Sequence, residues 1–242
     1  MVAPPRRLQR VPIALLAGLT AALVLQIGLR ATEPRPTALA TNLPAPPPIM
    51  VLRTAAFGEP VAASQLLTLY LQAFDTQPGI SIPFKDLDYP RLEGWLGSAL
   101  TLNPEGQYPL LLAAQVYSQV PDPEKQRLML EFVYRQFQVD PVRRWRWLAH
   151  AAVVAKHRLH DLPLALRYAR ALAERAQYPS VPSWARQMQI FLLEDLGEYE
   201  AARILLGGLL ASGTVTDPHE ILFLTERLNA LKAVEKSTKA PK

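Results

Sequence analysis

The chain has 242 residues, half of them apolar, which is enough for one domain with a hydrophobic core and a membrane anchor. Its formal charge is +5, but four arginines flank one apolar segment near the N-terminus, and the remainder carries 22 basic against 21 acidic residues. This distribution excludes a general nucleic-acid binder. The absence of cysteine excludes disulfides, thiolate nucleophiles and cysteine-based zinc sites.

The first predicted element is an uncharged apolar segment, residues 11–29. As a helix it would be about 28 Å long, enough to cross a hydrocarbon core of roughly 30 Å. Three arginines lie within residues 1–10, so we expect a cytoplasmic N-terminus and a single-pass inner-membrane protein whose C-terminal domain is periplasmic. The alternative is a signal peptide cleaved after Ala40, but that site lies far beyond Leu29, and we expect the anchor to be retained.

Two different regions follow the anchor. Residues 30–50 are rich in proline and are predicted to form a semi-rigid spacer. Residues 51–103 are predicted to form an irregular helical hairpin, because Val61–Phe74 and Tyr89–Leu102 carry apolar residues at helical spacing on either side of a Pro-Gly break.

Residues 104–234 show an internal period. Prolines at 104, 141, 179 and 218 are 37, 38 and 39 residues apart, and acidic residues suited to start helices recur between them at 122, 161 and 198. The pattern predicts a stack of helical hairpins that bury their apolar stripes against their neighbours. The predicted helices are Tyr108–Gln119, Pro123–Phe137, Val142–Leu159, Leu162–Ala176, Pro182–Leu196, Glu198–Leu210 and a capping helix, Pro218–Val234. Residues 235–242 are predicted to be a solvated basic tail.

The segment Leu196-Gly197-Glu198-Tyr199-Glu200-Ala201-Ala202 resembles the turn and second-helix start of tetratricopeptide repeats. The unit that begins at Asp161 keeps the acidic start and an alanine, and the unit at Asp122 lacks both the glycine and the alanine. The resemblance covers about half of the chain. It implies an all-α fold, with a transmembrane helix followed by a tetratricopeptide-like array that binds other proteins, as in some proteobacterial envelope proteins.

In tetratricopeptide arrays the first helix of each pair lines a peptide-binding groove. Aligning Ala165 and Ala202 with the family's second-helix alanine implies two sets of groove residues, and a weaker alignment adds a third. These are Trp147, His150, Val154, His157 and Arg158; Trp184, Gln187, Phe191, Glu194 and Asp195; and Tyr108, Leu111 and Gln115. Aromatic and charged side chains suit interface recognition. The alternative is that Trp147 and Trp184 are core residues, because a shift of one residue in the alignment moves every assignment.

The charges and histidines leave further alternatives open. Residues 143–175 carry a net charge of +6 and residues 194–226 one of −6, which indicates either two surfaces for charged partners or neutralisation between neighbouring hairpins. His150 and His157 are about two helical turns apart, too far to share one metal ion without help, so we expect no metal and no cofactor. Phosphate-loop and nucleophile-elbow motifs are absent from the sequence.

Together these features predict a non-catalytic, membrane-anchored scaffold that binds one or more envelope proteins and assists their assembly or secretion. An accessory subunit of a larger membrane complex is one alternative. An α-helical enzyme acting on glycans is another, and it would require two carboxylates on opposite sides of a cleft. A metal- or ligand-binding sensor is the third.

Overall fold

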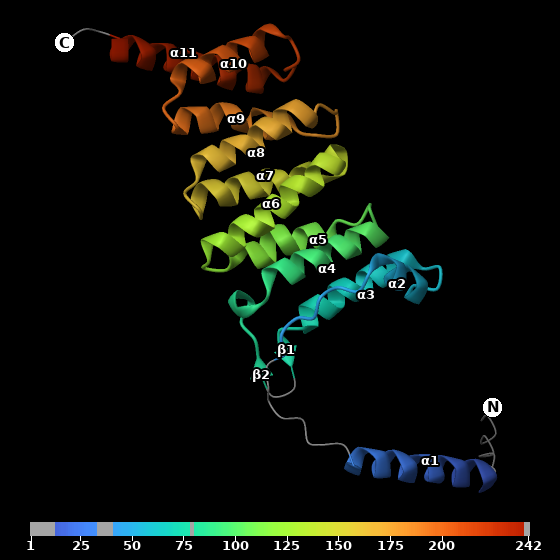
Figure 1. Ribbon diagram of the computed structural model, residues 1–242. Helices are drawn as coiled ribbons and strands as arrows, with labels where there is room; N and C mark the ends of the chain where they lie inside the picture. The colour runs from blue at the N-terminus through green and yellow to red at the C-terminus, as the bar shows by residue number, and fades with distance from the viewer. Residues whose placement is uncertain (1–12, 33–40, 78–79, 240–242) are drawn as a thin grey trace, which may run out of the picture. The chain divides into compact units, whose positions relative to one another are not determined.

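The computed structural model describes residues 13–32, 41–77 and 80–239 (Figure 1). The chain is 76% helical, so the predicted all-α class is confirmed. Helix α1 belongs to one compact unit, and helices α2 to α11 belong to a second. The predictions for residues 1–10, for the first two residues of the apolar segment, and for residues 33–40 and 240–242 lie outside the described residues.

Helix α1 (Ile13–Thr32) covers most of the predicted membrane segment. Its window Ile13–Arg30 has a mean hydropathy of 1.9, and its side chains are exposed. A 20-residue helix is about 30 Å long. Helix α1 is therefore long and apolar enough to cross a membrane, which supports anchoring.

Among the described residues, three α-helices and a pair of very short strands precede α5 in the chain after α1. Helices α3 and α4 were predicted and pack against each other, whereas the short helix α2 was not predicted. Asp88 starts α4 by accepting a hydrogen bond from the backbone N–H of Arg91 at 3.1 Å. The bounds are α2 (Ile49–Ala55), α3 (Pro60–Ala73), β1 (Thr76–Gln77), β2 (Ile80–Ser81), the 3-10 helix η1 (Phe84–Asp86) and α4 (Tyr89–Leu102).

Residues 41–48, the second half of the predicted spacer, are part of this folded unit, so the prediction of a spacer is wrong for them. Leu43 is only 1% exposed, and its carbonyl accepts a hydrogen bond from Arg91 Nη1 at 2.7 Å. The Pro44 carbonyl accepts one from Trp95 Nε1 at 2.8 Å. The physical reason is that an extended, proline-rich backbone leaves its carbonyls free to accept from α4.

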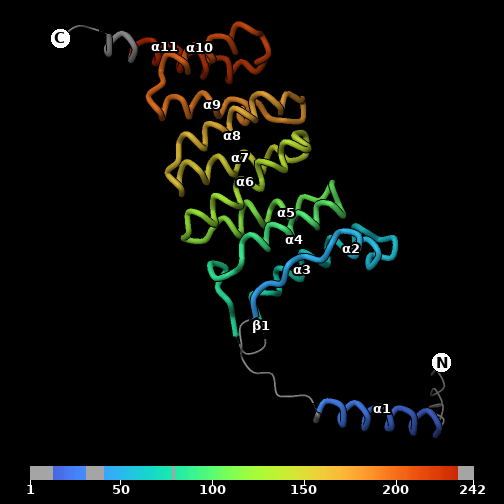
Figure 2. The backbone as a smooth tube through the Cα atoms, viewed as in Figure 1, coloured from blue at the N-terminus to red at the C-terminus, as the bar shows by residue number. Residues whose placement is uncertain are grey.

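The following helices pack in chain order, α6 on α7, α7 on α8, α8 on α9, α9 on α10 and α10 on α11 (Figures 1 and 2). Residues 108–119, predicted as one helix, are helical throughout but change type twice. The bounds are α5 (Tyr108–Leu111), the π-helix η2 (Leu112–Val116), the 3-10 helix η3 (Tyr117–Gln119), α6 (Pro123–Val139), α7 (Pro141–His157), α8 (Leu162–Arg175), α9 (Ser183–Asp195), α10 (Tyr199–Ala211) and α11 (Pro218–Lys239).

An aspartate and a proline start the central helices. The side chains of Asp122, Asp140 and Asp161 accept backbone N–H bonds at the first turns of α6, α7 and α8, and each of these helices has a proline in its first two positions. Glu198 makes no such bond, although α10 begins directly after it. Helix α11 continues five residues beyond its predicted end, so the backbone of residues 235–239 is helical rather than a frayed tail.

Candidate functional site

Ion pairs between separate segments join residues that lie 33 to 42 positions apart in the chain. Such pairs connect α4 to α6, the turn before α5 to α7, α6 to α8, α7 to α9 and α9 to α11. They are Glu93–Arg135, Glu105–Arg143, Arg127–Asp161, Glu131–Arg167, Lys156–Asp195 and Glu194–Arg227. Part of the predicted charge asymmetry is therefore neutralised between helices. Because most of these groups are half-exposed, we expect each pair to add little stability and the set to fix helix order.

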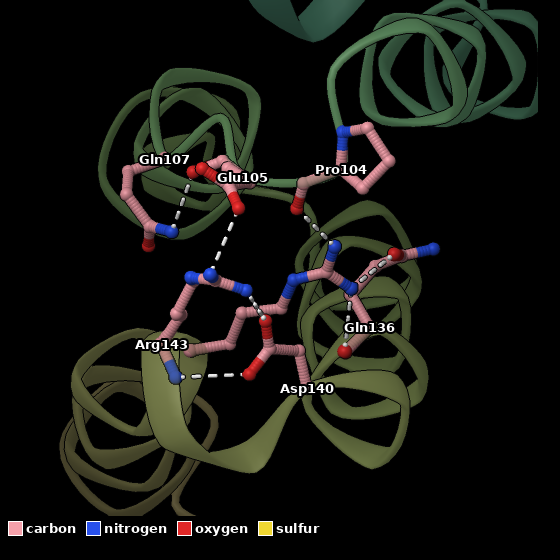
Figure 3. Close-up of polar contacts among 7 residues, drawn as sticks. Pro104, Glu105, Gln107, Gln136, Asp140 and Arg143 are labelled. Atoms are coloured by element: carbon pink, nitrogen blue, oxygen red, sulfur yellow. Dashed lines mark hydrogen bonds and ion pairs between the residues drawn. The ribbon is translucent and has the colours of Figure 1, made fainter.

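Two adjacent arginines tie the start of α7 to earlier segments. Exposed Arg143 bonds Glu105 at 2.8 Å and Asp140 at 3.0 Å (Figure 3). Arg144 is 3% exposed and donates to the carbonyls of Gln136 at 2.8 Å and Pro104 at 2.9 Å. Burial lowers the pKa of the Arg144 guanidinium below its usual value, which means that the folded protein holds a partly desolvated cation there.

The first predicted groove set lies mainly against the segment α5–η3. Trp147 is 9% exposed and donates from Nε1 to Gln107 Oε1 at 2.7 Å. Val154 is buried, and Arg158 donates to the carbonyl of Gln119 at 3.2 Å. The prediction of an open groove is wrong for Trp147 and Val154, because α7 has a neighbour on that side.

His150 of the same set is half-buried. Burial is the largest influence on its pKa and lowers it, a hydrogen bond with the Ala114 backbone acts in the opposite direction, and Arg158 lowers it further. The net pKa lies below the usual value, so the folded protein favours the neutral imidazole. Its Nε2 atom is buried and has no hydrogen-bond partner among the described residues. His157 is exposed, and no group of three potential metal ligands occurs within the described ranges.

The second predicted groove set mostly faces α11. Gln187 is buried and donates to Glu220 Oε1 at 2.5 Å, and Glu194 accepts from Arg227 Nε at 3.1 Å. The partly buried ring of Phe191 lies near that of Phe223, with the ring centroids 6.3 Å apart. The prediction of an open groove is therefore wrong for Gln187.

Trp184 and Asp195, from the same set, are exposed. The Trp184 ring is 52% exposed and packs edge-on against Trp145, with centroids 5.7 Å apart, while Asp195 pairs with Lys156 at 2.5 Å. Trp184 therefore packs on Trp145, a residue of α7 outside the predicted sets.

The third predicted set, on α5 and η2, is only partly buried. Tyr108 is exposed and accepts a hydrogen bond from Gln72 Nε2. Leu111 packs against the core, and Gln115 is exposed. This set therefore leaves two polar residues, Tyr108 and Gln115, on the surface.

A pocket of about 650 Å³ lies among the last helices, lined by the end of α8, by α9, by the second half of α10 and by the loop before α11 and the first turn of α11. Ile190, Ile204, Leu205 and Leu209 supply an apolar wall. Gln187 is the one predicted groove residue that lines it. One feature of the sequence could have indicated this pocket: the pair Gly207–Gly208 lies inside a helix, where glycine is unfavourable. A Cβ added at either glycine would meet no atom within 4 Å, so close packing does not require them, and Gly208 lines the pocket.

Three charged side chains line the pocket. Asp217 accepts from the backbone N–H of His219 at 2.8 Å and starts α11, and Glu220 accepts from Gln187. Arg186, the one cation among the lining residues, makes no side-chain hydrogen bond or ion pair with any described residue. The pocket therefore offers one uncommitted positive group beside an apolar wall.

The ionisable side chains of the pocket are Arg186, Asp217 and Glu220. Its lining residues include no histidine, lysine or cysteine, and its two carboxylates, Asp217 and Glu220, come from one end of a single helix rather than from opposite sides. Cleavage of a glycosidic bond requires opposed carboxylates.

No protein family, no curated protein and no solved structure matches this chain.

Proposed function

We propose that this protein is a membrane-anchored scaffold whose tetratricopeptide-like helical array binds a segment of another envelope protein. The observation that carries the proposal is the pocket lined by α9, α10 and the loop before α11. Its volume, about 650 Å³, lies in the range of sites that enclose a ligand or a few side chains of a partner.

The stack supports one wall of this pocket, helix α9, from two sides. Helix α9 is held from α7 by the Lys156–Asp195 pair and by the packing of Trp145 on Trp184. It is held from α11 by Glu194 and its partner Arg227. A pocket wall fixed on both sides loses little conformational entropy when a partner binds.

The predicted membrane anchor would determine where the proposed scaffold acts. Helix α1 would confine the array to the membrane surface, and the arginines that precede it in the sequence favour an array on the periplasmic side of the inner membrane. A partner segment bound there is held at high effective concentration beside the membrane during assembly or secretion.

An accessory subunit of a larger membrane complex is the second candidate, and a separate observation favours it. Ile221, Leu222 and Phe223, near the start of α11, are exposed. A cluster of exposed apolar side chains is typical of surfaces that another protein covers. In this case α11 would be the permanent contact and the pocket would lie beside it.

Site-specific photo-crosslinking in native membranes tests the scaffold proposal. The full chain would carry p-benzoylphenylalanine at Ile204, on the exposed pocket wall, or at Gln115, an exposed residue of the predicted groove. We expect a discrete crosslinked envelope protein from position 204 and none from position 115. A crosslinked envelope protein from position 115 alone would show that the partner binds in the predicted groove and not in the pocket. No crosslinked product from either position would contradict the scaffold proposal.

A further inference from the structure

We propose that the pocket recognises the free C-terminus of a peptide whose last side chain is apolar and whose preceding residues are basic or neutral. The inference rests on the proposed scaffold function and names the chemistry of the partner segment. It is carried by the arrangement of Arg186, the apolar wall and two carboxylates around one cavity.

Arg186 is the expected contact for the terminal carboxylate. It lines the pocket, it is partly buried, and its guanidinium has no partner among the described residues. Arginine binds carboxylates in a planar, two-pronged geometry, and such charge-assisted bonds are stronger than neutral ones. The nearby hydroxyl of Ser183 and amide of Gln189 also make no hydrogen bond within the described structure, so they remain open to a peptide backbone.

The apolar wall is the expected contact for the last side chain. Ile204 is 59% and Leu205 39% exposed, and both lie on the pocket beside Ile190 and Leu209. Covering this surface removes apolar area from water, which is favourable. Gly208 adds no side chain to this wall, and the space it leaves suits a branched aliphatic group.

The two carboxylates select what precedes the last residue. Asp217 and Glu220 give the lining a net charge of −1 with Arg186 included. Asp217 already accepts two backbone hydrogen bonds and Glu220 accepts one from Gln187, yet each carboxyl group has further acceptor capacity. An acidic residue before the terminus would be repelled here, whereas a lysine would be attracted.

The test measures binding of labelled six-residue Gly/Ser peptides to the full chain in nanodiscs by fluorescence anisotropy. The reference peptide ends in Lys-Ser-Leu with a free carboxylate, and three others change one feature each: a C-terminal amide, a final serine, or glutamate in place of lysine. Hexanoate serves as an apolar carboxylate that is not a peptide. The variants are Arg186→Gln, Ile204→Ser and Asp217→Asn, and the matched control is Arg170→Gln, at an exposed residue of α8 outside the pocket.

We expect amidation to weaken binding roughly 10- to 100-fold, the range of a charge-assisted hydrogen bond. Arg186→Gln should weaken binding of the free acid by a similar factor and leave binding of the amide unchanged, while Arg170→Gln changes neither. Ile204→Ser should reduce the preference for leucine over serine as the last peptide residue. Asp217→Asn should reduce the preference for lysine over glutamate at the third residue from the end. Asparagine can still accept the helix-start hydrogen bonds, so the fold is kept.

Three outcomes would overturn the inference. The first is equal binding of the acid and amide peptides, or of the wild type and Arg186→Gln. The second is hexanoate binding as tightly as the reference peptide, which would make the pocket a site for acyl carboxylates. The third is no peptide binding at all. If crosslinking at Ile204 still yields an envelope protein in that last case, the scaffold proposal survives and only the terminal-carboxylate inference fails.

Discussion

Helices α8 and α10 are nearly equal in length, but the structure covers them very differently. Seven side chains of α8 are buried, among them Tyr168 and Leu172, whereas in α10 only Ala202 and Leu206 are buried. Helix α8 packs against α7 and α9, while α10 leaves Ile204 and Leu205 exposed beside the pocket. Because α10 also has two neighbours, α9 and α11, the difference shows that the closeness of packing decides burial more than composition does, and the candidate site lies beside the less covered of these two helices.

The largest expected effect comes from matched cavities in these two helices. Leu172 and Leu206 are both fully buried. Leu172→Ala should lower the free energy of unfolding of the whole stack by roughly 3–5 kcal/mol. Leu206→Ala should mainly open α10 and α11, because a terminal hairpin unfolds without its neighbours. Hydrogen exchange followed by mass spectrometry distinguishes the two, and faster exchange in α7 and α8 of Leu206→Ala would contradict the comparison.

A smaller effect is expected at the start of α7. Arg144→Ala leaves the carbonyls of Pro104 and Gln136 without this donor and should lower the free energy of unfolding by about 2–3 kcal/mol. Arg143→Ala, one residue away, removes only exposed pairs and should change stability little. Urea denaturation followed by circular dichroism measures both. Equal losses of unfolding free energy in the two variants would show that the burial of Arg144 does not make its hydrogen bonds more stabilising than the exposed pairs of Arg143.

The smallest effect concerns acid stability and His150. Burial is the main cause that lowers its pKa in the folded protein, so the unfolded chain binds a proton at higher pH than the folded one does. The contribution of neutral His150 to the free energy of unfolding is complete above the pKa of histidine in the unfolded chain, about 6.5. It is lost as the pH falls from there toward the lower pKa of His150 in the folded protein. His150→Gln should flatten the decline in stability between pH 7.5 and 5.5. The exposed His157→Gln is the control, and an unchanged slope in His150→Gln would exclude this role.

Much of the helix order was predictable from local chemistry. Asp122 and Asp161 recur at a regular spacing with prolines beside them, and both form the helix starts that this pattern indicates. From α6 to α10, the predicted ends differ from the observed ones by no more than two residues. Helix starts depend on a few adjacent residues, which is why the sequence predicts them well.

The covered faces of the helices could not be predicted in the same way. Trp145 and Trp147 are two residues apart and point about 200° apart around α7, so one packs on Trp184 and the other bonds Gln107. The family alignment assumed one open face, but α7 has neighbours on both sides. The pocket was missed for a related reason, because it depends on how α9, α10 and a loop meet.

The packed segment around Leu43 also has a mechanical consequence. A pull on the chain at Thr41 would act on its two hydrogen bonds to Gln77 Oε1, on buried Leu43 and on the bonds that Arg91 and Trp95 make to the segment. These contacts hold the segment at several points, so tension from the chain before Thr41 acts on them before it reaches α3 and α4. Helices α3 and α4 would then stay folded under forces that peel apart a helix attached only by its end.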